Sequence, residues 1–147
     1  MKEEKYDINV SDDWLVYEFT SIGPKGEIPK VVVYQHIEGK LYNLAFGDKD
    51  GISGNIDDLV ISDNKDTEIV LATVASTIFD FFNNYEGTIV LAKGSTKSRT
   101  RLYRRHLTLF LEFIENDFVL LGELNGEVER FQKNKDYTSF LITKVLK

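Results

Sequence analysis

Short runs of apolar and aromatic residues, separated by turn residues, mark the first third of the chain. Residues 14–22 (WLVYEFTSI), 28–37 (IPKVVVYQHI) and 41–46 (LYNLAF) are predicted to be strands, because β-branched and aromatic residues favour extended structure. The segments at 23–26 (GPKG) and 38–40 (EGK) supply turn residues between them. We therefore expect an antiparallel meander at the start of the domain.

A polar connection follows, and after it the apolar residues are spaced as in a helix. Residues 47–64 are rich in Gly, Asp, Asn and Ser and are predicted to form a long surface connection with an apolar island at 59–61. Beyond it, apolar residues recur every three or four positions, which predicts a helix from Asp66 or Thr67 to Asn84. The residues of this stripe are Val70, Leu71, Val74, Ile78, Phe81 and Phe82.

A nearly continuous apolar run and a second amphipathic stretch follow. The run at 88–93 (TIVLAK) is typical of a buried strand. A second helix is expected to begin near Ser95 or Ser98 and to end near Asn116. Its predicted inward residues are Leu102, His106, Leu107, Phe110, Phe113 and Ile114, and Trp14 and the phenylalanines elsewhere are also expected in the core.

A hairpin and a last strand complete the series. Asn125-Gly126 predicts a type I′ turn between strands at 118–123 and 127–131, and a final strand is expected at 137–145. The element order β-β-β-α-β-α-β-β-β indicates an α+β fold of two layers, a largely antiparallel sheet with two helices on one face. Residues 1–147 are expected to form a single domain, with 1–13 as a flexible or loosely attached arm.

Composition narrows the classes of function. The chain has no cysteine, which excludes disulfides, thiolate metal sites and a cysteine nucleophile. It has no apolar run of about 20 residues, the length of a membrane-spanning helix, and no secretory signal pattern. The sequence therefore predicts a cytoplasmic protein that does not enter a membrane, with no metal site and no cofactor.

Charge is unevenly distributed along this acidic chain, whose net charge is −6. Residues 93–106 (KGSTKSRTRLYRRH) contain six cations and no anion, whereas residues 48–68 are predominantly acidic. A helix start with open backbone amides attracts anions, and cations placed there alone would be repelled by the helix dipole. The cationic run therefore predicts an anionic partner.

The predicted site is a strand, a turn and a helix start that together bind a phosphate-bearing ligand or nucleic acid. Glycine would let the ligand approach the backbone, hydroxyls would cap the helix or donate to phosphate, and arginines would supply bidentate hydrogen bonds. The site residues are Lys93, Gly94, Ser95, Thr96, Lys97, Arg99, Arg101, Arg104 and Arg105, with Tyr103 and His106 as possible accessories for base stacking and proton transfer.

Other readings of the cationic run remain open. The arginines could pair with acids of the same chain, such as Asp57, Asp58, Asp63 or Glu68. Alternatively, the basic helix could dock on the acidic loop of a second subunit or a protein partner. A phosphoryl- or nucleotide-processing enzyme is a third hypothesis, but the Walker spacing is missing and no catalytic set can be assigned from the sequence.

Four segments resemble a family of short, uncharacterised bacterial proteins common in Bacteroidota. They are NLAFGD, D-x-x-x-V-L-A-T-V-A, K-G-S-T-x-x-R-T-R-L-Y-R and D-Y-x-x-F-L-I, and the resemblance extends from about Tyr17 onward. The third segment, which begins at Lys93, is the most specific. The resemblance implies that the basic segment is a family feature, and it supplies no catalytic residue.

Overall fold

The computed structural model describes residues 4–52, 54–60 and 64–144, and a single sheet dominates it. The strands are β1 (Asn9–Val10), β2 (Val16–Gly23), β3 (Gly26–Glu38), β4 (Leu41–Asp48), β5 (Gly51–Ile52), β6 (Ile89–Lys93), β7 (Phe118–Leu124), β8 (Glu127–Arg130) and β9 (Ser139–Lys144). The helices are the 3₁₀ helix η1 (Ile56–Val60), α1 (Thr67–Asn84), α2 (Lys97–Leu102) and α3 (Arg104–Glu112).

Strand order in the sheet is β1-β2-β3-β4-β6-β9-β7-β8, with the short β5 paired on β4. All neighbours are antiparallel except β4 and β6, which run parallel after the crossover through α1. This parallel pairing is short, since it joins only Leu41–Asn43 to Ile89–Leu91. The prediction of a largely antiparallel α+β fold is confirmed.

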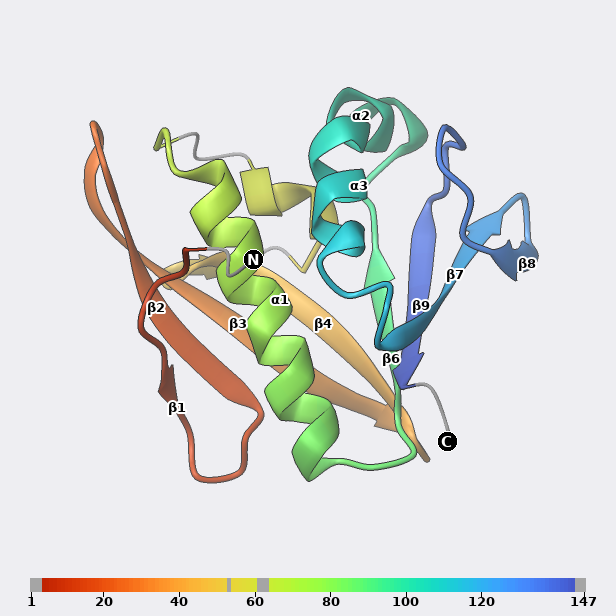
Figure 1. Ribbon diagram of the computed structural model, residues 1–147, viewed down its shortest axis with the longest axis horizontal. Coiled ribbons are helices and arrows are strands. Elements are labelled where there is room, and N and C mark those ends of the chain that lie inside the picture. The colour runs from red at the N-terminus through yellow and green to blue at the C-terminus, as the bar shows by residue number, and fades with distance from the viewer. Residues whose placement is uncertain (1–3, 53, 61–63, 145–147) are drawn as a thin grey trace.

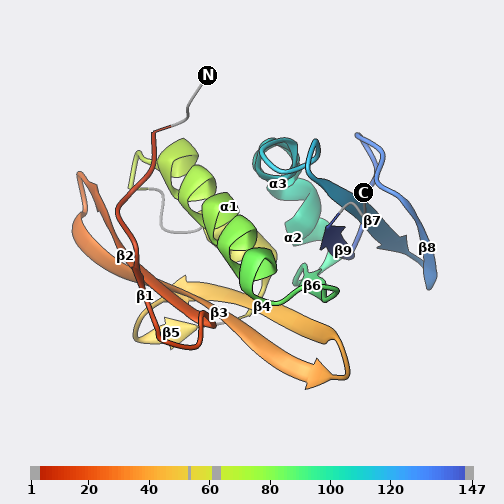
Figure 2. The same ribbon diagram turned by 60° about the horizontal axis from the view of Figure 1, so that its bottom comes forward.

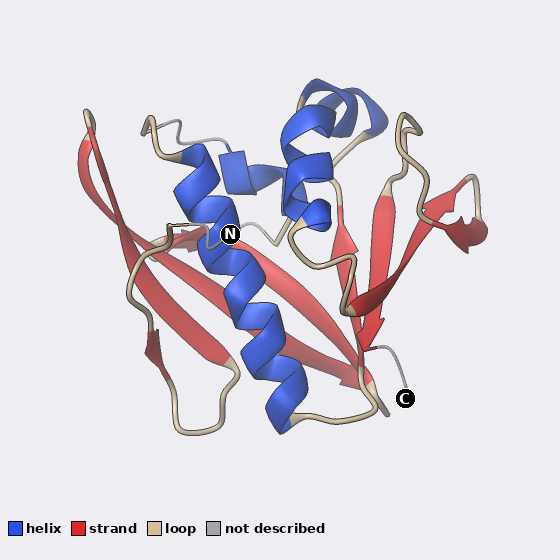
Figure 3. Ribbon diagram, in the orientation of Figure 1, coloured by secondary structure: helices blue, strands red, loops and turns tan. Residues whose placement is uncertain are grey.

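The helices cover one face of the sheet (Figures 1 and 2). Side chains alternate between the two faces of each strand, so every second residue of β2 to β9 points toward the helices. Figure 3 shows α1 crossing the N-terminal strands while α2 and α3 stand beside β6. The buried core between the layers includes Tyr34 of β3, Phe81 of α1, Phe110 of α3 and Phe140 of β9.

The predicted long connection at 47–64 is more structured than expected. After β5 the chain forms η1, in which Ile56 and Leu59 are buried at 2% and 3% exposure. These two apolar residues explain why the segment returns to the core instead of remaining on the surface. Ile61, the last residue of the predicted apolar island, lies outside the described residues.

The second predicted helix is two helices, and this part of the prediction was wrong. Tyr103 has φ −102° and ψ 8°, which ends α2 and starts α3 in a new direction. As a result Leu102, predicted to point inward, is 73% exposed. Trp14, also expected in the core, is 37% exposed and adopts a positive φ of 62° ahead of β2.

The N-terminal arm lies against both layers. The backbone amide of Tyr6 donates to Thr73 Oγ1 of α1 at 2.9 Å, and its ring stacks on Phe19 of β2. Its hydroxyl donates to Asp66 at 2.5 Å, and β1 extends the sheet beside β2.

Across the part of the chain that the structure describes, no helix has both the length and the apolar character needed to cross a bilayer.

Candidate functional site

The bend between β6 and α2 is occupied by a carboxylate of the same chain. Ser95 donates from its hydroxyl to Asp57 Oδ2 at 2.7 Å, and its backbone amide lies 3.4 Å from the same oxygen. Asp57, from η1, is fully buried. Thr96 accepts a hydrogen bond from the amide of Arg99 at 3.0 Å and caps α2. The hydroxyl groups of Ser95 and Thr96 are thus used within the protein.

Gly94 permits close packing of the bend instead of close approach of a ligand. A Cβ added at Gly94 would lie 2.3 Å from Thr100 Oγ1 and 3.3 Å from the carbonyl oxygen of Thr138. Its amide also donates to that carbonyl at 2.7 Å. Glycine is therefore required here because β6, α2 and the start of β9 meet.

The first part of the cationic run spreads in several directions. Lys93 is exposed near the end of β6, on the face away from the helices. Lys97 Nζ donates to Asn125 Oδ1 at 3.0 Å in the β7–β8 turn. Arg99 reaches Asp58 at 3.7 Å and lies over the Tyr103 ring. These three cations do not converge on a common position.

Asp58 carries a perturbed carboxyl group beside this bend. Burial raises the pKa of Asp58, the adjacent charge of Asp57 raises this pKa further, and Arg99 opposes both effects. Of the acids considered for pairing with the arginines within the same chain, Asp58 pairs with Arg99, whereas Asp57 contacts Ser95. Asp63, another acid considered for this pairing, lies outside the described residues.

The second part of the run does converge. Arg101 Nε lies 3.1 Å from Asp136 Oδ2, and Arg104 Nη1 lies 2.8 Å from Asp136 Oδ1. One carboxylate from the loop between β8 and β9 therefore holds two arginines from different helices. Asp136 fixes these guanidinium groups next to each other across the break at Tyr103.

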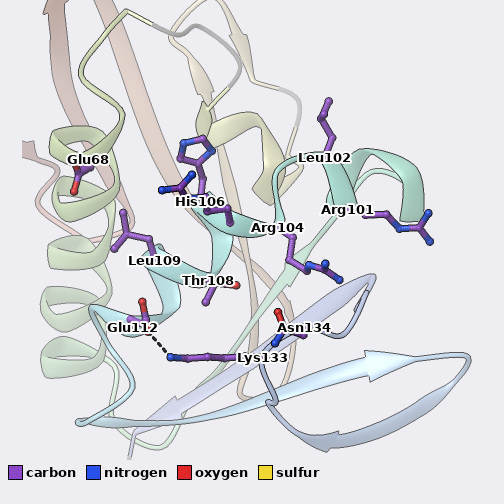
Figure 4. Close-up of a pocket in the computed structure, with 11 residues that line it drawn as sticks. Glu68, Arg101, Leu102, Arg104, His106, Thr108, Leu109, Glu112, Lys133 and Asn134 are labelled. Atoms are coloured by element: carbon purple, nitrogen blue, oxygen red, sulfur yellow. Dashed lines mark ion pairs between the residues drawn. The ribbon is translucent and has the colours of Figure 1, made fainter.

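These arginines open onto a groove between α3 and the loop that follows β8, with a volume of about 920 Å³. In Figure 4, Arg104 extends toward Asn134, and Lys133 extends toward Glu112, to which it is paired at 2.7 Å. The lining residues are Glu68, Arg101, Leu102, Arg104, Arg105, His106, Thr108, Leu109, Glu112, Lys133 and Asn134.

The groove lining is cationic in sum. Four arginine or lysine side chains line the groove with two glutamates, and Asp136, which holds Arg101 and Arg104, reduces the local excess to one positive charge. Arg105 is exposed, and the described residues include no ion-pair partner for it. The groove can therefore bind an anion by charge and by hydrogen bonds from guanidinium groups.

Sequence reasoning missed the loop residues of this groove. Lys133, Asn134 and Asp136 lie more than 25 positions beyond the cationic run, and only the fold brings them to α3. The polar segment KNKD was a signal of a turn, and Asn134 has the positive φ of 68° that such turns favour. Nothing in that segment indicated which surface the turn would face.

The structure brings together one subset of the predicted site and separates the rest. Arg101, Arg104, Arg105 and His106 share the groove. The bend residues and the first cations of the run lie elsewhere, as described above. Across the described residues, no group of three or more His, Asp or Glu side chains is arranged to hold a metal ion.

The fold and groove define a two-layer α+β domain with a cationic surface site. The chain belongs to a family of unknown function, DUF6934, whose model matches residues 2–145. Comparison with curated proteins finds no match, and comparison with solved structures finds none either.

Proposed function

We propose that this protein binds a phosphate-bearing ligand in the groove between α3 and the β8–β9 loop. The observation that carries the proposal is that Arg101, Arg104, Arg105 and Lys133 all line one open groove. The role is binding: the groove holds an anion, and no reaction is assigned to it. The ligand is either a phosphorylated small molecule or a nucleic acid, which share the phosphate group.

The paired arginines supply the geometry for recognition. Asp136 already spans two guanidinium groups with one carboxylate, and a phosphate has the same two-oxygen edge. Arg104 is the inner of the two, since its side chain is 38% exposed against 62% for Arg101. We expect a ligand phosphate to contact Arg104 and Arg105 first, beside the Asp136 clamp.

The other lining groups suit the rest of a ligand. Thr108 and Asn134 offer a hydroxyl and an amide, and Leu102 and Leu109 offer apolar surface. Apolar surface next to cations favours a ligand that carries a base or another ring over inorganic phosphate alone. The groove lining is thus mixed, with charged groups for affinity and neutral groups for selectivity.

Binding can be measured by isothermal titration calorimetry and by NMR shift changes, with inorganic phosphate, ADP and a short single-stranded oligonucleotide as probes. Arg105→Glu should weaken binding of the preferred probe about tenfold, because it reverses a charge in the groove. Lys40→Glu, a reversal at the exposed β3–β4 turn, is the matched control and should leave affinity unchanged.

The three probes separate the two ligand classes. A single-stranded oligonucleotide should show affinity that falls steeply with salt, by about 0.7 logarithmic units per neutralised phosphate for each tenfold increase in salt. The affinity for a nucleotide should depend less steeply on salt concentration. Failure of all three probes to shift groove resonances would contradict the proposal.

A protein-docking role for the basic segment has less support. Asp57 and Asp58 of the acidic segment already contact Ser95 and Arg99 in the same chain. The combination Arg101→Glu and Arg104→Glu should therefore abolish ligand binding and leave the oligomeric state unchanged. Loss of an oligomer in that variant would favour docking instead.

Two expectations from the sequence accompany the proposal. We expect a cytoplasmic location in bacteria, where nucleotides and nucleic acids are abundant, and we expect the basic segment to recur across the family. Family members that keep Arg104 and Asp136 together would support a shared ligand. Members that lose both while keeping the fold would argue against it.

A further inference from the structure

The face of the sheet that the helices leave open carries a regular apolar patch on β6, β9 and β7. Antiparallel sheets with one wet face normally place polar residues there. Here the paired positions Leu91, Leu141 and Leu121 form one row across the three strands. The next row consists of Ile89, Thr143 and Val119.

These side chains point away from the core because strand residues alternate. Val90, Phe140 and Leu120, their immediate neighbours along each strand, are buried beneath the helices. All three leucines remain partly exposed, and Ile89 is 39% exposed. Figure 2 shows the helices on the other face, and in the described part of the chain no element covers this one. The nearly continuous apolar run in β6, typical of a strand buried on both sides, is thus buried on one side only.

The row at the other end of the patch is charged, and its two charges are opposite. It consists of Lys93, Ser139 and Glu123, in which the serine hydroxyl donates to the glutamate at 2.5 Å. Lys93 and Glu123 lie two strands apart, a backbone separation of about 10 Å, and the ion pairs of the described residues do not include one between them. Each charge therefore faces solvent on the open face.

We infer that this patch is a two-fold interface with a second copy of the chain, in which the axis runs along β9. Rotation about β9 places β6 of one copy over β7 of the other and preserves each row. Lys93 of each copy then faces Glu123 of the partner subunit, so the interface contains two such pairs. The leucine row of one copy packs against the same row of the other. An axis across the strands would instead set Lys93 against an isoleucine, so charge complementarity selects the axis along β9.

The proposal is independent of the ligand groove, which lies on the helical side of the molecule. Sheet faces pack about 10 Å apart in such an arrangement, with interdigitated side chains. The apolar rows supply the buried area, and the two symmetric ion pairs fix the register. In the dimer, β6, β7 and β9 would then be buried on both faces.

Sedimentation velocity on the full chain over a concentration series tests the inference, and we expect a dimer. Leu141→Arg should yield a monomer, because it places two like charges on the axis. Leu102→Arg is the matched control, since Leu102 is 73% exposed on the opposite side, and it should remain a dimer. Circular dichroism and thermal unfolding check that both variants fold.

Exchange of the charges at Lys93 and Glu123 tests how the residue rows of the two copies are aligned in the proposed dimer. Lys93→Glu and Glu123→Lys should each weaken the dimer about tenfold, and the double exchange should restore it. An equimolar mixture of the two single variants should also restore association, because residue 93 of each copy then faces an opposite charge at residue 123 of the other, which pairing within one chain cannot provide. A wild-type monomer at NMR concentrations, a dimer that survives Leu141→Arg, or a double exchange that fails to restore association would each overturn the inference.

Discussion

Single positions in the basic segment have different roles from those their residue types suggest. The sequence indicated that Gly94 and Ser95 would meet a ligand, since glycine and hydroxyl groups are typical of phosphate-binding turns. In the fold, Thr100 and Asp57 occupy those places. Residue type alone predicted the polarity of the bend, but its partner comes from η1, almost 40 positions earlier.

Gly94→Ala should lower the free energy of unfolding by about 1–3 kcal/mol, because the added methyl group meets Thr100 and the Thr138 carbonyl. Urea denaturation followed by tryptophan fluorescence or circular dichroism measures this loss. Gly51→Ala is the control, since a Cβ there has no neighbour within 4 Å. Equal stability of the two variants would show that the bend has room for a side chain.

The Asp58 carboxyl group should affect how the free energy of unfolding depends on pH. Because the folded-state pKa of Asp58 is raised, stability should fall as pH rises from its unfolded pKa through its folded pKa. Asp58→Asn removes this titration, so the variant should gain stability relative to wild type as pH rises from acid to neutral. Urea denaturation at several pH values measures the difference, and a gap that stays constant with pH would contradict the assignment.

At the scale of elements, the periodicity of the chain predicted nearly every strand and helix. Asn125 and Gly126 both have positive φ, 55° and 83°, as the predicted type I′ turn requires. The exceptions are β1, β5 and η1, which the pattern did not predict, and the break between α2 and α3, where apolar spacing continued through Tyr103. Periodicity is insensitive to a break of one residue, whereas in the fold Arg101 and Arg104, on either side of the break, pair with the same Asp136 carboxylate.

Asp136→Asn should loosen α2 without unfolding the domain. The variant removes the charge that holds two arginines, so backbone amides of 97–102 should exchange with deuterium faster. The loss of overall stability should be about 1 kcal/mol or less, because these ion pairs are partly exposed. Glu112→Gln, which breaks the Lys133 pair on α3, is the control and should leave exchange in α2 unchanged.

At the scale of the whole molecule, the α+β class and the two layers followed from the sequence, whereas strand order and the cationic groove did not. The groove joins α2 and α3 to a loop near the end of the chain, and no local pattern encodes that proximity. The same is true of the arm, where Tyr6 bridges Asp66 and Thr73.

Tyr6 variants should measure what the arm contributes to global stability. Tyr6→Phe loses the hydrogen bonds to Asp66 and Ile22 and should cost about 1–2 kcal/mol. Tyr6→Ala also loses the stacked ring and should cost about 2–4 kcal/mol. Thermal and urea unfolding provide both values, and an alanine variant as stable as wild type would show that the arm adds nothing.

The short parallel contact between β4 and β6 has a mechanical consequence. Three residue pairs join the two halves of the sheet there, with a single bridge from Asn55 to Lys93 farther along, whereas β3 and β4 share eight. A tensile force applied across the strands from β2 to β8 would meet the shortest strand pairing at this junction. Under load the sheet should separate there first, between β4 and β6. The strands β1 to β5 and the strands β6 to β9 should each remain paired.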